Sequence, residues 1–480
     1  MAKKQVESRS GSRSYRVKKG TSGPRQVKRS TPAKKKSSHQ TTYNGGNGLD
    51  HLGFQESLDR VAILFSGGPA PGGNAVISAL ATQFLNDGVS VVGLLRGFQY
   101  LQQFDPRQGK VMVEGEHYMD LKLGHVTGIR HLGGTILKTS RANPGKVEGN
   151  EIKKLSDLKD PAKTDGLRRV IAALKRLRID ALVTIGGDDT LKTANYLRHM
   201  GVNVVHVPKT IDNDYYGISW TFGYFTAIDV AKDLIVNLYA DARSTNSYFL
   251  VECMGRKSGW YTYGAGVAGL AVRMVAVEDI KGKLDVERLA VDLTNLIIQR
   301  ERMGKKYGVI AVSEGLADLL PEGEKPQRFD EHGNAVLSDA KISNRLAYAM
   351  EAEYKRITGR RRKIVPKLVG YETRSAPPCA YDVLLGSQLG MGAYRLVNEG
   401  RFGQMVSVGE NLQIEAISFD ELIDPKTLRA RVRFVPTNGD FYKLKQALEF
   451  RARTELFENG ERVESAVFGN EHGKRKYRQV

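Results

Sequence analysis

The chain has 480 residues, 41% of them hydrophobic and 26% charged, an ordinary composition for a soluble globular protein of two or three domains. No apolar run approaches the ~18 residues that cross a bilayer, so the sequence excludes a membrane-spanning protein. Two cysteines, Cys253 and Cys379, form neither a disulfide framework nor a zinc motif, and they favour a reducing, cytoplasmic location.

Much of the net charge of +20 lies at the N-terminus. Residues 1–49 contain thirteen Lys and Arg but one acid, Glu7, a charge of +12 that leaves +8 for the other 431 residues. This segment has almost no large apolar residue to offset the entropy lost on ordering, so we expect a disordered tail. Such a tail can contact polyanions such as RNA. A transit peptide is the alternative, although Gly20, Gly23 and two prolines would interrupt an amphipathic helix.

The folded part begins with a strand, a glycine-rich loop and a helix. The apolar run Arg60–Phe65 predicts the strand, residues 66–74 the loop and residues 75–86 the helix. Unpaired backbone N–H groups and the helix dipole at such a junction attract an anion. Gly67 and Gly68 allow it to approach closely because they lack a Cβ. The loop matches neither the P-loop nor GxGxxG, so it predicts a phosphate site of no particular class.

A second glycine-started loop covers residues 133–141 and ends in Arg141. A guanidinium can contact phosphate through two parallel hydrogen bonds, which favours a second anion-binding loop. A turn with a surface arginine is the alternative reading of the same spacing. The polar residues 143–165 that follow predict a surface excursion.

Two short strands and the loops after them carry most of the chemistry. Residues 181–185 and 202–207 are rich in β-branched residues and predict buried strands, and residues 190–200 between them predict a helix. A strand, a helix and a strand at this spacing form a right-handed crossover, so the strands are parallel and their loops meet at one sheet edge. The charged residues of these two loops are Asp188, Asp189, Lys209, Asp212 and Asp214.

Strands and helices continue to alternate after residue 214, which predicts an α/β fold with two doubly wound (Rossmann-like) domains. Arg256, Glu314 and Arg374 follow the ends of predicted strands and indicate a second anion or sugar site. The predicted helices are 224–239, 285–300, 344–358, 379–398 and 440–455, and the predicted strands are 248–253, 308–312 and 364–369.

These elements divide the chain into domains. We expect a first domain at 58–223, completed by 375–455, and a second at 224–374. Residues 460–480 are polar and basic, so we expect a partly disordered end.

Several motifs together resemble the phosphofructokinase family over roughly 58–403. Pro-Lys-Thr-Ile-Asp-Asn-Asp combined with Gly-Gly-Asp-Asp is the most specific of them. The motifs are Gly-Gly-Pro-Ala-Pro-Gly-Gly-Asn at 67–74, Gly-Gly-Thr-Ile-Leu-Lys-Thr-Ser-Arg at 133–141, Gly-Gly-Asp-Asp at 186–189, Pro-Lys-Thr-Ile-Asp-Asn-Asp at 208–214, Met-Gly-Arg at 254–256, Ser-Glu-Gly at 313–315 and Gly-Tyr-Glu-Thr-Arg at 370–374.

The resemblance implies an active site in the cleft between the two domains, where a phosphoryl group passes to the 1-hydroxyl of fructose 6-phosphate. The family's base corresponds to Asp212, its Mg²⁺ ligand to Asp188, and residues that support the transferring group to Thr210 and Asp214. We expect the donor phosphates at Gly67, Gly68, Arg141, Asp189 and Lys209. The positions that match the family's sugar-phosphate site are Met254, Gly255, Arg256, Glu314, Tyr371 and Arg374.

Two positions predict the donor. ATP-using members of the family usually have glycine in place of Asp189 and often a small residue in place of Lys209. The larger side chains would fill the space of the α-phosphate and nucleoside, and the two could hydrogen-bond each other. We therefore expect inorganic pyrophosphate as the donor and a reversible reaction.

Other readings stay open at this point. The first is an ATP-dependent phosphofructokinase, and the second is a regulatory or binding paralogue without catalysis, against which Asp188, Asp212 and Asp214 argue.

The resemblance implies a homo-oligomer, a dimer or tetramer with shared sites. Ser247 stands where many members lend an arginine to the neighbouring subunit, which weakens that expectation at this residue.

Overall fold

The structure is a computed structural model that describes residues 58–147, 150–328, 336–451, 457–458 and 461–462. The disordered tail predicted for 1–49 lies outside the described residues, and so does nearly all of 460–480. No helix in the described ranges is both long enough and apolar enough to cross a membrane.

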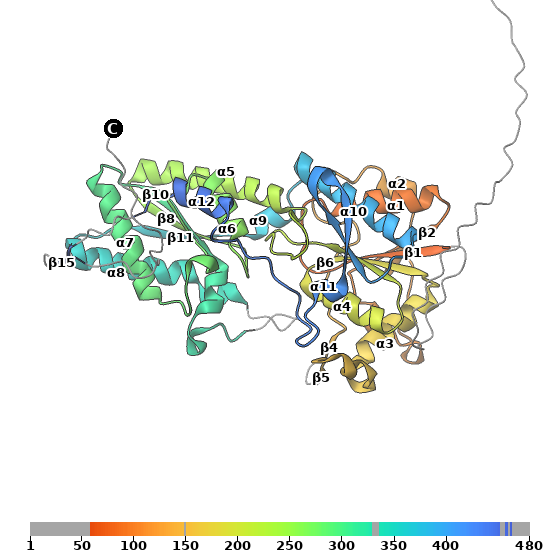
Figure 1. Cartoon of the computed structure of the whole chain (residues 1–480). Coiled ribbons are helices and arrows are strands. Elements are labelled where there is room, and N and C mark those ends of the chain that lie inside the picture. Colours follow the sequence, from red (N-terminus) through yellow and green to blue (C-terminus); the bar gives the residue numbers. More distant parts are fainter. Residues whose placement is uncertain (1–57, 148–149, 329–335, 452–456, 459–460, 463–480) are drawn as a thin grey trace, which may run out of the picture. The chain divides into compact units, whose positions relative to one another are not determined.

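Seven strands form the first sheet (Figure 1). Its central strands are parallel, and an antiparallel pair closes each edge, β2 with β3 and β12 with β13. In order across the sheet the strands are β13 (Ile414–Ser418), β12 (Gln404–Val408), β7 (Val204–Pro208), β6 (Ala181–Gly186), β1 (Arg60–Phe65), β2 (Ser90–Leu94) and β3 (Tyr118–Leu121).

Helices cover both faces of this sheet. Figure 1 shows α1 and α10 over one face and α3 and α4 over the other. The helices have clear end signals: Asp160 caps α3 through the backbone N–H of Ala162, and Pro161 occupies the first helical position. The helices are α1 (Gly73–Asn86), α2 (Leu123–Val126), α3 (Pro161–Arg176), α4 (Asp188–His199), α10 (Ala380–Asn398) and α11 (Phe419–Leu422).

The second sheet has four strands, all parallel. In Figure 1, α5, α6 and α12 lie over one face and α7 and α8 over the other. The strand order is β11 (Ile364–Val369), β8 (Tyr248–Cys253), β10 (Gly308–Ser313) and β9 (Arg273–Val275). The helices are α5 (Tyr224–Thr245), α6 (Trp260–Ala268), α7 (Val286–Arg302), α8 (Ile342–Thr358), α9 (Tyr371–Arg374) and α12 (Asp440–Leu448). Short hairpin strands are β4 (Lys146–Val147), β5 (Asn150–Glu151), β14 (Phe457–Glu458) and β15 (Glu461–Arg462).

Strand register aligns the functional loops. Gly186 at the end of β6 pairs with Pro208 at the end of β7, so the loops that follow start at the same level. On the second sheet, Cys253 pairs with both Ser313 and Val369, so three further loops start side by side. All five loops leave the carboxyl ends of parallel strands, where α/β sheets bind ligands.

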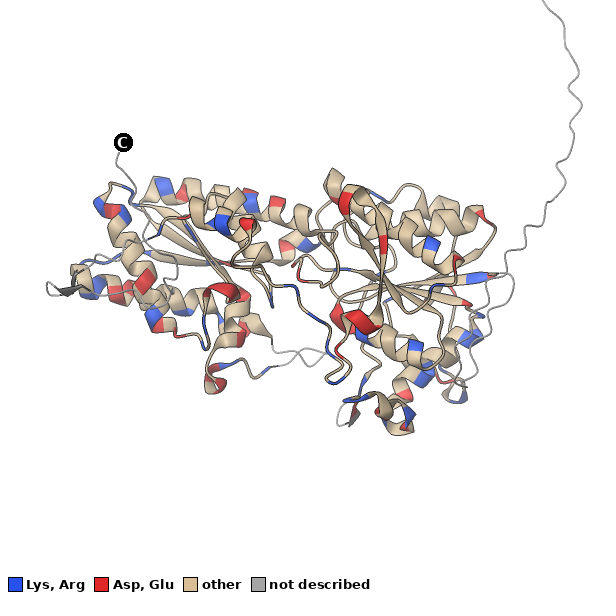
Figure 2. Ribbon diagram, viewed as in Figure 1, with Lys and Arg blue, Asp and Glu red and all other residues tan. Residues whose placement is uncertain are grey.

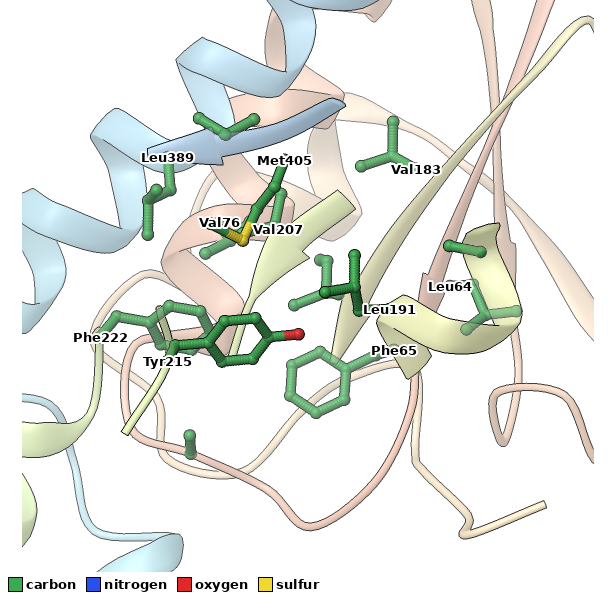
Figure 3. Packing of buried hydrophobic residues seen from close by; sticks show 14 of the residues in the cluster. Leu64, Phe65, Val76, Val183, Leu191, Val207, Tyr215, Phe222, Leu389 and Met405 are labelled. Atoms are coloured by element: carbon green, nitrogen blue, oxygen red, sulfur yellow. The ribbon is translucent and has the colours of Figure 1, made fainter. Parts of the chain in front are cut away.

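The core fills the space between the sheets and their helices. Figure 3 shows Leu64, Val183 and Val207 of three neighbouring strands with Leu389 of α10 nearby. These side chains are fully buried, and a separate cluster under the four-stranded sheet includes Ile310. Burial of this kind is the main stabilising contribution in folding, so the sheets form a firm base for the loops.

The predicted α/β class with two doubly wound units is confirmed by the two sheets. The strands Arg60–Phe65, Tyr248–Cys253 and Ile364–Val369 have the predicted bounds. Asp285 caps α7 by accepting from the backbone N–H of Arg288, and α5 extends beyond the predicted residue 239 to Thr245. The expected completion of the first domain by 375–455 stays a prediction: β12 and β13 belong to the seven-stranded sheet and α10 packs against it, whereas α12 packs against α6.

Candidate active site

The loops after β6 and β7 form one wall of a cavity of about 140 Å³. Helix α4 begins at Asp188, two residues earlier than predicted, so both acidic residues of Gly-Gly-Asp-Asp lie in its first turn. Six residues that the sequence singled out line the cavity: Asp188, Lys209, Thr210, Asp212, Asp214 and Arg256. Six more residues complete the lining: Gly187, Tyr215, Lys257, Ala430, Arg431 and Val432.

Asp188 is held as a carboxylate by neighbouring lysines. The Lys257 ammonium donates to Oδ2 at 2.5 Å, and the backbone N–H of Asp189 donates to Oδ1 at 2.9 Å. Partial removal from water would raise the pKa of Asp188, but the charges of Lys257 and Lys192 outweigh this effect and lower the pKa to about 2. Since its side chain remains 42% exposed, a negative oxygen ligand is available at the cavity wall at neutral pH.

Lys209 is buried, with 5% of its surface exposed. Its ammonium donates to the carbonyl oxygen of Gly68 at 2.5 Å and lies 5.3 Å from the centre of the Phe65 ring. Burial, together with the charges of Arg374 and Arg141, lowers the pKa of Lys209 to about 7, although the charges of Asp212 and Asp188 oppose this change. The lysine is therefore a poorly compensated cation beside the glycine loop.

Asp212 and Asp214 follow Lys209 in the same loop. The Asp212 carboxylate accepts from the backbone N–H of Arg256 at 3.5 Å, and Asp214 accepts from the hydroxyl of Thr210 at 3.3 Å. Burial raises the pKa of Asp212, partly offset by Arg374. Burial and the charge of Asp212 together raise the pKa of Asp214 to about 7. Two carboxyl groups with weakened acidity thus face the cavity, as proton transfer near neutral pH requires.

A neutral hydrogen-bonded chain supports this loop from inside the sheet. His206 of β7 lies between the hydroxyls of Thr184 and Tyr215, 2.9 Å from each. Burial lowers the pKa of His206 to about 3, so the imidazole stays neutral at neutral pH. Figure 3 shows the ring of Tyr215 between Phe222 and Phe65. The cavity wall at Tyr215 is therefore fixed by packing and by uncharged hydrogen bonds.

The glycine loop approaches Lys209 closely. Gly67 has φ 82°, which favours glycine, and a Cβ there would lie 3.4 Å from the Lys209 ammonium. A Cβ on Gly68 would lie 3.5 Å from a guanidinium nitrogen of Arg374. The hydroxyl of Thr139, in the second predicted anion loop, donates to the carbonyl of Gly67 at 2.6 Å. The two glycine-started loops are thus bonded to each other.

The other residues that the sequence predicts for donor binding lie beside these loops. Arg141 is close enough for its charge to lower the pKa of Lys209. Asp189 forms an ion pair with Lys192 at 2.5 Å, one turn along α4. Lys209 bonds to the glycine loop, so both residues have partners other than each other.

The residues predicted for the sugar-phosphate site lie at the carboxyl ends of β8, β10 and β11. Met254 is buried against Gly370, and Gly255 has φ 116°, where a Cβ would lie 3.1 Å from the Ser258 carbonyl. The side chain of Arg256 lies 3.8 Å from Asp318. Arg256 is the member of this group that lines the cavity.

Glu314 and Arg374 connect this group to Asp212 in the loop after β7. Burial and the charge of Asp212 raise the pKa of Glu314 to about 7, while Arg374 lowers it. The guanidinium of Arg374 lies 5.0 Å from the centre of the Tyr371 ring, and Tyr371 is 70% exposed. Arg374 therefore lies near carboxylates of both sheets, whereas Tyr371 faces outward.

Comparison with known proteins agrees with this arrangement. Residues 60–397 match the family described as Phosphofructokinase. The chain belongs to the phosphofructokinase family. It is 35% identical over 420 residues to the pyrophosphate--fructose 6-phosphate 1-phosphotransferase of Thermotoga maritima, covering 84% of this chain and 93% of that protein. It is also 35% identical over 372 residues to the ATP-dependent 6-phosphofructokinase of Corynebacterium efficiens, covering 76% and 93%.

Solved structures show the same fold. The phosphofructokinase of Saccharomyces cerevisiae has a TM-score of 0.57 at 23% identity, and this phosphofructokinase covers 45% of that longer chain. The pyrophosphate-dependent phosphofructokinase of Marinobacter aquaeolei has a TM-score of 0.55 at 17% identity, over 88% of this chain and 99% of that one.

Sequence reasoning missed two parts of this phosphofructokinase's cavity. Lys257 directly follows the Met-Gly-Arg motif, so a basic residue next to a recognised motif was the available signal. Ala430, Arg431 and Val432 come from a segment beyond the family match, and no local pattern marks them.

Proposed function

We propose that this phosphofructokinase transfers a phosphoryl group from inorganic pyrophosphate to the 1-hydroxyl of fructose 6-phosphate, giving fructose 1,6-bisphosphate and phosphate, in a reaction that runs in both directions. The observation that carries the choice of donor is the buried ammonium of Lys209, 2.5 Å from the Gly68 carbonyl. A cation there can bind a terminal phosphate oxygen, and it occupies space that a longer donor would need.

Asp212 is the proposed base. The sugar's 1-hydroxyl would give its proton to this carboxylate while its oxygen forms a bond to phosphorus. The bond from that phosphorus to the bridging oxygen breaks, and the leaving phosphate takes the electron pair. Burial raises the pKa of Asp212, which brings it nearer the working pH than an exposed aspartate. Asp214 has a pKa of about 7, so its protonated form would donate to a neighbouring phosphate oxygen, while the hydroxyl of Thr210, which donates to Asp214 at 3.3 Å, would orient it.

Cationic groups surround the position where charge develops. Phosphoryl transfer needs alignment and charge neutralisation more than covalent help from the protein. Lys209, Arg256 and Lys257 line the cavity, and the charge of Arg374 reaches Lys209 and Asp212. These four groups would neutralise the phosphates of donor and sugar.

We propose Mg²⁺ as the metal, held by Asp188 together with phosphate oxygens of the donor. Within the described ranges, no group of three or more His, Cys, Asp or Glu side chains could hold a metal ion alone. Mg²⁺ commonly binds through one or two carboxylates plus substrate phosphates, which fits a lone ionised aspartate at a phosphate site. The ion would supply positive charge on the donor phosphates.

The donor is tested by assaying purified protein with pyrophosphate and with ATP at equal concentrations. Formation of fructose 1,6-bisphosphate with pyrophosphate supports the proposal, and formation with ATP alone would overturn it. ATP is the second candidate because several relatives at 31–35% identity are ATP-dependent. The double variant Asp189→Gly, Lys209→Gly should weaken pyrophosphate use and raise ATP use, whereas Lys175→Gly, on the exposed face of α3, should change neither.

We also propose a cytoplasmic homo-oligomer, a dimer or tetramer. Strand β11 lies at the edge of the four-stranded sheet, and its Leu368 is 42% exposed. An edge strand with exposed apolar side chains suits pairing with a second copy. Light scattering coupled to size exclusion tests this, and a monomer at micromolar concentration would contradict it.

A further inference from the structure

The segment between α11 and α12 crosses the catalytic loop. We call residues 424–435 the strap. It lies beyond residues 60–397, which match the family. Figure 1 shows it in dark blue, running from α11 beside the seven-stranded sheet to α12 beside the four-stranded sheet. Figure 2 shows basic positions along it, and they are Lys426, Arg429, Arg431 and Arg433.

The strap is bonded to the loop that carries both catalytic candidates. Val432 forms an antiparallel bridge with Tyr215, and the backbone N–H of Arg433 donates to the carbonyl of Asp214 at 2.8 Å. The Arg433 guanidinium donates twice to the carbonyl of Asn213, at 3.2 and 2.8 Å. Asn213 is fully buried with φ 54°, an unusual conformation for a residue with a side chain. Arg433 therefore holds the backbone between Asp212 and Asp214.

The other side of the strap is fixed to elements of the four-stranded sheet. The Arg433 guanidinium lies 4.5 Å from the centre of the Trp260 ring, and the indole N–H donates to the Arg433 carbonyl at 3.1 Å. The backbone N–H of Val435 donates to Glu278 at 2.9 Å, and the same carboxylate oxygen accepts from Gly259 at 2.9 Å. One arginine thus ties the catalytic loop of one sheet to α6 of the other.

Arg431 differs from Arg433 because its side chain is exposed at the cavity. Ala430, Arg431 and Val432 line the same cavity as Asp188 and Lys209. The Arg431 guanidinium lies 5.8 Å from the centre of the Tyr216 ring, and no carboxylate in the described part of the chain pairs with it. An arginine on the wall of a phosphate site, without an internal counter-ion, is suited to bind an anionic substrate.

We propose that the strap is part of the active site: Arg433 positions the loop that carries Asp212 and Asp214, and Arg431 binds a phosphate oxygen of the donor. The role of Arg431 rests on the proposed function, whereas that of Arg433 holds for phosphoryl transfer from either donor.

Two substitutions at Arg431 and two at Arg433 test the proposal in the full-length protein. Arg431→Ala should raise the KM for pyrophosphate about tenfold or more with kcat changed little, and Arg431→Lys should recover part of the loss. The matched control is Arg429→Ala, an exposed arginine of the strap that does not line the cavity, and it should behave as wild type. Equal KM values in Arg431→Ala and Arg429→Ala would overturn the binding role.

Arg433→Met should lower kcat at least tenfold while the KM for fructose 6-phosphate stays within about twofold. Arg433→Lys, which can still donate to Asn213, should recover more than Arg433→Met. Trp260 fluorescence in a Trp220→Phe background should change in Arg433→Met, because the guanidinium leaves the indole. A folded Arg433→Met protein with normal kcat would overturn the positioning role.

If wild type uses ATP and not pyrophosphate, the proposed donor fails, and the same variants are then compared with ATP.

Discussion

Replacing Lys209 with methionine should stabilise the substrate-free protein while removing its affinity for the donor. The lysine is 5% exposed, and burial with two nearby arginines lowers its pKa from 10.5 to about 7. The folded protein therefore binds fewer protons than the unfolded chain between pH 7 and 10.5. By linkage, the charged lysine destabilises the fold most strongly below pH 7, and this effect fades as the pH rises toward 10.5.

The size of the effect follows from the pKa change. A fall from 10.5 to about 7 corresponds to a destabilisation of about 5 kcal/mol at pH 6 and about 2 kcal/mol at pH 9. Methionine keeps the length of the side chain but leaves the Gly68 carbonyl without its donor, which costs about 2 kcal/mol. The free energy of unfolding of Lys209→Met should therefore exceed that of wild type by about 3 kcal/mol at pH 6, and the two should be nearly equal at pH 9.

Reversible denaturant unfolding of wild type and Lys209→Met, without substrates and at pH 6, 7.5 and 9, measures the gain. Lys175→Met, at an exposed position of α3, is the control and should change little at any pH. Pyrophosphate binding by calorimetry should be lost in Lys209→Met alone. A variant that is less stable than wild type at pH 6, or a difference that does not shrink as the pH rises, would refute the reasoning.

Three further predictions concern the same cavity. Asp212→Asn should lower kcat by about 10²–10⁴ with unchanged circular dichroism, and a loss below tenfold would contradict its role as the base. Pyrophosphate binding to wild type at pH 8 should take up protons, because an anion raises the pKa of Lys209 from about 7. The calorimetric binding enthalpy of wild type should then depend on the ionisation enthalpy of the buffer, and an enthalpy that is the same in all buffers would contradict this. Chelation of divalent ions should abolish turnover. Without substrates, Lys257→Met should bind Mn²⁺ roughly fivefold to tenfold more tightly than wild type, since no ammonium competes for Asp188. Unchanged Mn²⁺ affinity would count against Asp188 as the metal ligand.

Much of the fold could be predicted because its signals are local. The strand Arg60–Phe65 is a short apolar run between breakers, and its bounds were predicted correctly. The strands β3, β12 and β13 were not predicted, since each has four or five residues and lies at or next to a sheet edge, where the apolar pattern is short. The length of α5 was underestimated because its last residues are mostly polar or small, and Ala242 is the one buried residue among them, so no apolar stripe marks them.

The site could be predicted only where a motif carried it. The loops after β6 and β7 meet because their strands are neighbours and parallel, which the spacing already indicated. Lys257 pairs with Asp188 across 69 positions, and Arg433 bonds to Asn213 across 220 positions. Pairing over such distances depends on how the two sheets and the segment after α11 pack together. It cannot be predicted from residue type and spacing within a short stretch of sequence.

The pKa changes point to one property of the free site: like charges are held together in two sets. Burial is the largest cause of both pKa changes, and like charges add to it: Asp212 and Asp188 raise the pKa of Asp214, while Arg374 and Arg141 lower that of Lys209. Anionic phosphates relieve the repulsion among the cations, so part of the binding energy is the removal of a strain that the empty protein carries. The same residues then limit stability and enable binding, because a site arranged for its substrates is destabilised without them. Lys209 should show this opposition most clearly, since it is the most buried of the cations that line the cavity.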